Sequence, residues 1–85
     1  MTPADIAAEI LRQTEARGTG KSICPSEVAR ALAPDDWRPL LAPVRRAAAA
    51  LSDAGQVLIL RHGKPVPASE MRGVIRLATT GKEPA

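Results

Sequence analysis

The sequence predicts a small α+β domain that is mainly helical, and three observations lead to this prediction. The chain has 85 residues, which is enough to build one hydrophobic core and too few for two domains. Three stretches before residue 55 space apolar residues three and four positions apart, as amphipathic helices do. Two stretches after residue 55 are short and rich in Val, Ile and Leu, which is typical of strands.

The first helix is expected to begin at Pro3. Thr2 is a suitable N-cap, and proline is favoured at the first helical position because the missing N–H would have no partner there. Ile6 and Ile10 lie one turn apart and belong to a buried stripe. The glycine-rich run 18–20 ends this helix.

Residues 22–24 are expected to form a single bridge-like strand directly before the second helix. Pro25 suits the first position of that helix, with either Cys24 or Ser26 as its cap. The helix is short because residues 33–36 carry turn signals. Its predicted buried stripe consists of Val28, Ala29 and Leu32.

The third helix is expected to begin at Asp35 or Asp36 and to run to residues 54–55. Pro39 is suited to a first turn, whereas Pro43 inside the helix would remove a backbone hydrogen bond. The sequence therefore predicts either a kink at Pro43 or a first turn separate from the main helix. The predicted core stripe consists of Trp37, Leu41, Val44, Ala48 and Leu51.

Residues 56–61 and 74–78 are expected to pair as antiparallel strands. The connection between them, residues 62–73, is too long for a tight turn and contains two prolines. The strand around Ile23 could pair with the edge of this hairpin and tie the first two helices together. Residues 1–78 would then form the single domain, and residues 79–85 a flexible tail.

This order of elements is that of a winged helix, in which three helices with a helix-turn-helix are closed by a β-hairpin. A two-stranded hairpin is only marginally stable alone, and the three helices supply the layer that buries one of its faces. The lone Trp37 is expected to fill the junction between the second helix, the third helix and the hairpin, although a role as an exposed anchor for a protein partner is the alternative.

Basic charge is concentrated in the second half of the chain. Residues 1–37 carry four basic and six acidic side chains, whereas residues 38–76 carry seven basic and two acidic ones. The spacing of 100° per residue places three arginines on the outer face of the third helix, and three further basic residues frame the long connection. The candidate nucleic-acid contacts are Arg38, Arg45, Arg46, Arg61, Lys64 and Arg72.

Double-stranded DNA is the partner that this pattern predicts. Small alanines between the arginines let a helix approach a groove, while arginine reaches phosphates or the O6 and N7 atoms of guanine. The prediction requires the basic groups of the third helix and of the hairpin to project from one side of the molecule. A small bacterial transcription regulator is the corresponding role.

Composition excludes several other classes of function. One Cys and one His give no disulfide, metal site or cofactor site, and no acid, base and nucleophile are grouped for an enzyme. The chain has no Phe or Tyr and a single Trp, so it lacks the aromatic platforms that bind single-stranded nucleic acid. No apolar run resembles a membrane span or a signal peptide, and the expected location is the cytoplasm.

A docking module with the same fold and no nucleic-acid role is the alternative prediction. An exposed apolar patch around Leu40, Val66 and Met71 would favour it, because such patches mark protein interaction sites.

Several short blocks of the sequence resemble a small bacterial family of uncharacterised domains with a winged-helix-like fold. The similarity extends from about residue 5 to residue 77, and it implies the fold rather than a function. The most specific block runs from Ile23 to Arg30. The other similar blocks are residues 34–38, 44–45, 63–66, 72–73 and 75–77.

Overall fold

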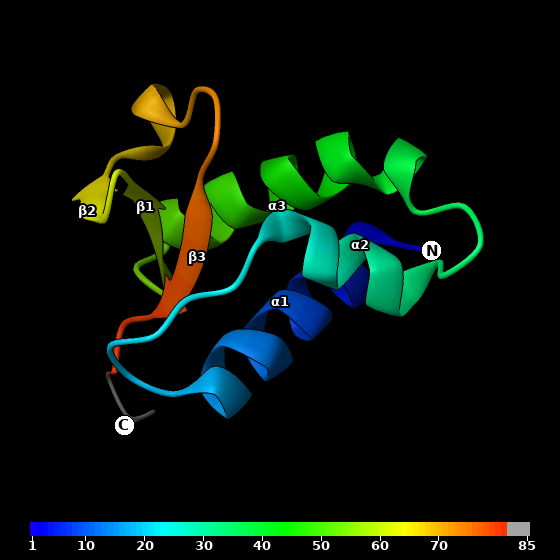
Figure 1. Ribbon diagram of the computed structural model, residues 1–85, viewed down its shortest axis with the longest axis horizontal. Helices are drawn as coiled ribbons and strands as arrows, with labels where there is room; N and C mark the ends of the chain where they lie inside the picture. Colours follow the sequence, from blue (N-terminus) through cyan, green and yellow to red (C-terminus); the bar gives the residue numbers. More distant parts are fainter. Residues whose placement is uncertain (82–85) are drawn as a thin grey trace.

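The computed structural model describes residues 1–81 and contains three α-helices, two short 3-10 helices and a three-stranded antiparallel sheet (Figure 1). This α+β fold is compatible with the winged-helix arrangement. In chain order the elements are α1 (Pro3–Arg17), α2 (Pro25–Leu32), η1 (Arg38–Leu40), α3 (Leu41–Asp53), β1 (Val57–Arg61), β2 (Lys64–Val66), η2 (Ala68–Glu70) and β3 (Arg76–Thr79).

The core lies where the helices meet the sheet. Figure 1 shows the sheet at one end of the molecule and the helices extending away from it. Aliphatic side chains from all three helices, from β1 and β3, and from the segments just before α2 and β3 form one buried cluster. Its members are Ile6, Ile10, Ile23, Val28, Ala29, Val44, Ala48, Leu51, Val57, Ile59, Ile75 and Leu77.

Helix α1 begins and ends as predicted. The Thr2 hydroxyl accepts a hydrogen bond from the Asp5 N–H at 3.2 Å, and the Asp5 carboxylate accepts one from the Thr2 N–H at 2.9 Å. This reciprocal pair is a capping box, which satisfies donors that a helix leaves free at its start. Gly18 ends the helix with a φ of 95°, a conformation that glycine adopts without steric cost.

Helix α2 is capped by Cys24, which decides between the two predicted caps. The Glu27 carboxylate accepts a hydrogen bond from the Cys24 N–H at 2.7 Å. Val28 and Ala29 are fully buried as predicted, and Leu32 is half-buried.

Helix α3 begins later than predicted, and the start at Asp35 or Asp36 is wrong. The chain first forms the separate turn η1, which contains Pro39, and α3 begins at Leu41. Pro43 is then the third residue of α3, where a backbone N–H has no partner within the helix. The proline therefore removes no hydrogen bond, and the separate first turn is the predicted alternative that the structure contains.

The connection over residues 62–73 is not one long loop, and this prediction is wrong. His62 and Gly63 have φ values of 54° and 78° and form a two-residue turn between β1 and β2. Positive φ at both positions matches the twist of an antiparallel hairpin. In that hairpin Ile59 pairs with Val66, and Arg61 pairs with Lys64. The chain then passes through η2 before it returns as β3.

Strand β3 pairs with β1, and it also pairs with the segment between α1 and α2. Ile23 and Leu77 exchange two backbone hydrogen bonds of 2.8 Å, which confirms the predicted bridge. The strand starts at Arg76 rather than at Val74, whose side chain is 86% exposed. Its last residue is Thr79, the first residue of the expected tail, and residues 82–85 of that tail lie outside the described residues.

Candidate nucleic-acid interface

A hollow of about 480 Å³ lies beside the β1–β2 turn, and we call it the wing hollow. Arginines from β1, from the segment before β3 and from β3 itself meet around it, because the hairpin turn brings the end of β1 next to the returning chain. The lining residues are Leu60, Arg61, His62, Gly63, Arg72, Gly73, Val74 and Arg76.

A second hollow of about 320 Å³, the α2 hollow, lies between the start of α2, the start of α3 and the segment before β3. Its lining residues are Cys24, Pro25, Ser26, Arg30, Trp37, Leu41, Arg45, Gly73, Val74 and Ile75. Gly73 and Val74 line both hollows, so the two are neighbours on one surface. We call this surface, together with Arg38, the cationic face.

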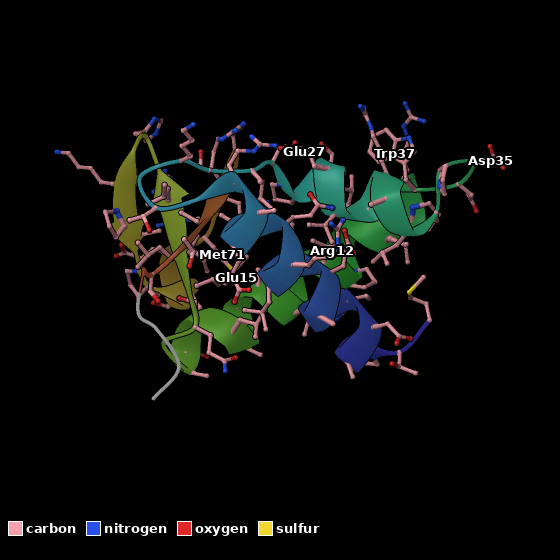
Figure 2. All side chains as sticks on the ribbon, turned by 90° about the horizontal axis from the view of Figure 1, so that it is seen from below. Arg12, Glu15, Glu27, Asp35, Trp37 and Met71 are labelled. Atoms are coloured by element: carbon pink, nitrogen blue, oxygen red, sulfur yellow. The ribbon has the colours of Figure 1, made fainter. Side chains whose placement is uncertain are left out.

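Figure 2 shows the same gathering of charge. Side chains that end in nitrogen project along the upper edge of the molecule, over the strands and α2, on the side that carries Glu27 and Trp37. Arg12 and Glu15 of α1 lie below this edge. The positive surface is thus built over the sheet and α2.

Two arginines of the cationic face are held by hydrogen bonds within the fold. Arg45 donates to the carbonyl oxygens of Met71 at 2.7 Å and of Gly73 at 3.2 Å. Arg76 donates to the hydroxyl of Ser22 at 2.8 Å and to its carbonyl oxygen at 3.0 Å. These two side chains fix the segment before β3 and the segment before α2, and we treat them as positioning residues.

The guanidinium groups of Arg61 and Arg72 make no hydrogen bond or ion pair within residues 1–81. The ion pairs in this part of the chain join Arg12 to Glu9 and Arg17 to Glu27, and neither includes a predicted contact residue. Unpaired cations beside a hollow keep their donors available for an external anion.

Arg30 and Arg38 lie against the ring of Trp37. Their Cζ atoms are 4.3 Å and 4.5 Å from the ring centroid, within the range of cation–π attraction. Trp37 is half-buried at the edge of the core and lines the α2 hollow, so its predicted place between helices is correct, while the ring also carries two cations.

Glu27 is a carboxylate at the start of α2 that is influenced by an arginine of the cationic face, Arg76. The hydrogen bond from the Cys24 N–H lowers the pKa of Glu27 most, burial opposes this effect, and the charges of Arg17 and Arg76 lower the pKa further. The carboxylate is therefore held ionised at the start of α2, where it binds Arg17 at 2.7 Å.

The predicted contact residues do not all lie together. Arg38, Arg45, Arg61 and Arg72 belong to the cationic face. Arg46 instead lines an apolar groove between α1 and α3. Lys64 lies on the edge strand β2, opposite Arg61, and lines neither hollow.

Sequence reasoning left Arg30 and Val74 out of the site. Arg30 lies outside the predicted buried stripe of α2, and the spacing of residues in that helix does not indicate a contact with Trp37, which lies on the other side of a turn. Val74 was expected inside a strand, and only the later start of β3 exposes it. Arg76 is also absent from the predicted contacts, and its position opposite Leu60 of β1 brings it to the wing hollow.

Within residues 1–81, no three His, Cys, Asp or Glu side chains are grouped as metal ligands require. Among the described helices, none has the length and apolar character needed to cross a membrane.

Comparison with protein families matches residues 3–80 to the family described as "Protein of unknown function (DUF3253)". The match covers nearly the whole chain, and the chain belongs to this family. The resemblance to a family of uncharacterised domains is thereby confirmed. A search of curated proteins found no match.

Proposed function

We propose that this domain binds double-stranded DNA through the cationic face. The observation that carries the proposal is the pair of adjoining hollows, which are lined by arginines from α2, α3, β1, β3 and the segment before β3. Four guanidinium groups of this face, those of Arg30, Arg38, Arg61 and Arg72, have no carboxylate partner within residues 1–81. DNA phosphates are the anions that such a surface attracts over a wide area.

The proposal assigns different roles to the predicted arginines. Arg61 and Arg72 contact phosphates, because their donors are free and they flank one hollow. Arg45 and Arg76 position the chain and make no direct contact with DNA. Arg46 has no part in binding, because it lies in the groove between α1 and α3. Since DNA lies in the cytoplasm of bacteria, a transcription regulator of this kind would act there.

Fluorescence anisotropy with a labelled duplex of random sequence tests the proposal. The full chain should bind at low salt, and affinity should fall steeply as salt rises, with a slope that reflects the number of phosphates contacted. A lack of binding at low salt would contradict the proposal. Binding to single-stranded DNA should be weaker, because the chain has one Trp and no Phe or Tyr for stacking.

Protein docking is the second candidate function, and a different feature favours it. Leu40, Val66 and Met71 do not form the exposed patch that would favour docking, since all three are half-buried against the core. An apolar hollow of about 500 Å³ between α1 and α3 is the surface that docking could use instead. Its apolar lining includes Pro3, Ile6, Ala7, Pro43, Ala47, Ala50, Leu51 and Ala54. Failure to bind duplex DNA would favour this candidate.

A further inference from the structure

Two arginines and a tryptophan form a distinct cluster at the α2 end of the cationic face. Arg30 lies in the last turn of α2, and Arg38 is the first residue of η1. Both place Cζ within 4.5 Å of the centroid of the Trp37 ring. We call this cluster the Arg–Trp–Arg stack. The attraction between each cation and the ring restricts the orientation of both guanidinium groups before any partner binds.

The hydrogen-bond donors of this stack are unused. A guanidinium group that stacks on an aromatic ring uses its flat face, so its N–H groups remain free in the plane. Arg30 and Arg38 are exposed, and no hydrogen bond or ion pair occupies either guanidinium within residues 1–81. Asp35 does not neutralise them, and Figure 2 shows it at the end of the molecule beyond Trp37.

The position of the stack suggests what it contacts. The turn η1 directly precedes α3, the helix that occupies the place of the recognition helix in this order of elements. In helix-turn-helix proteins the N-terminal residues of that helix contact base edges in the major groove. Guanine presents O6 and N7 there, and these two acceptors match the fork of an arginine.

An arginine with a fixed orientation recognises a guanine edge better than a mobile cation does. A phosphate attracts any positive charge, whereas two parallel hydrogen bonds to one base edge require a planar group in a fixed direction. On the basis of the DNA-binding function proposed above, we propose that the Arg–Trp–Arg stack recognises guanine, with an arginine of the stack donating to O6 and N7. Arg61 and Arg72 then supply phosphate contacts that are independent of sequence.

The test uses duplex pools of random sequence made either with guanine or with 7-deazaguanine, in which a C–H group replaces N7. Anisotropy, with the labelled duplex at limiting concentration and the protein titrated in excess, gives the affinity of the full chain for each pool. The unmodified protein should bind the guanine pool about tenfold more tightly. The double variant R30K/R38K keeps both charges but loses the planar fork, so it should bind both pools equally, at the weaker affinity.

R72K is the matched control, because it makes the same chemical change at a predicted phosphate contact. It should retain the tenfold preference for guanine. Equal binding of both pools by the unmodified protein would overturn this inference and leave DNA binding intact. Loss of the preference in R72K to the same extent as in R30K/R38K would also overturn it. No binding to either pool at low salt would overturn the proposed function itself.

Discussion

Arg45 of α3 donates a hydrogen bond of 2.7 Å to the carbonyl oxygen of Met71, and this contact joins the helix to the segment before β3. A second bond reaches Gly73 at 3.2 Å. The same segment lines both hollows of the cationic face. Arg45, which was predicted to contact DNA, therefore positions the segment that lines the cationic face.

Replacing Arg45 with alanine should lower the free energy of unfolding by about 1 kcal/mol, because one half-buried and one exposed charge-assisted hydrogen bond are lost. R46A is the matched control, since Arg46 is exposed on the same helix and makes no hydrogen bond within residues 1–81. Its effect should stay within about 0.5 kcal/mol. Urea denaturation measures both values. Equal midpoints for the two variants would show that the contact with Met71 contributes nothing to stability.

Substitutions at the two residues of the β1–β2 turn should change the stability of the fold in opposite directions. Gly63 has a φ of 78°, so G63A should destabilise the fold by about 1 kcal/mol or more. His62 has a φ of 54°, and H62N should stabilise the fold by a few tenths of a kcal/mol because Asn-Gly is favoured in this turn. Thermal unfolding of both variants provides the measurement. A neutral G63A would contradict the tight turn and favour the long connection.

Acid should weaken the fold through Glu27. Hydrogen bonding to the Cys24 N–H and the neighbouring arginines lower the pKa of Glu27 in the folded state. Its contribution to stability is therefore complete above the ordinary pKa of a glutamate, near 4.5, and is lost as pH falls through the lower value of the folded state. E27Q should reduce stability at pH 7 and flatten the dependence on pH below 4.5. Denaturation curves between pH 7 and about pH 3 measure this, and an unchanged dependence in E27Q would assign the acid effect to other carboxylates.

The parts of the fold that the sequence predicted are those with strong local signals. The two ends of α1, at Thr2 and Gly18, were predictable because helix caps depend on a few adjacent residues. Residues 22–24 were expected to form only a single bridge because they lie too close to the start of α2 for a longer strand, and Ile23 does pair with Leu77. The start of α3 was missed because Pro39 fits a 3-10 turn as well as an α-helix. Strand β2 was missed because three residues that include a proline carry no strand pattern.

The candidate site was harder to predict because it depends on contacts between distant segments. A helical projection places Arg45 and Arg46 on the outer face of α3, yet it does not show which segment packs beside each one. The segment before β3 binds Arg45, and α1 borders the groove that holds Arg46. Arg30 and Trp37 are separated by a turn, and no rule of sequence spacing predicts that they stack.

The salt dependence of duplex binding in two single variants tests the central claim most directly. R72A and R46A remove the same charge from exposed positions, one on the wing hollow and one in the groove between α1 and α3. We expect R72A to weaken binding and to reduce the slope of log affinity against log salt by about 1, while R46A leaves the slope unchanged. Equal slopes for R72A, R46A and the unmodified protein would contradict the assignment of this face to DNA.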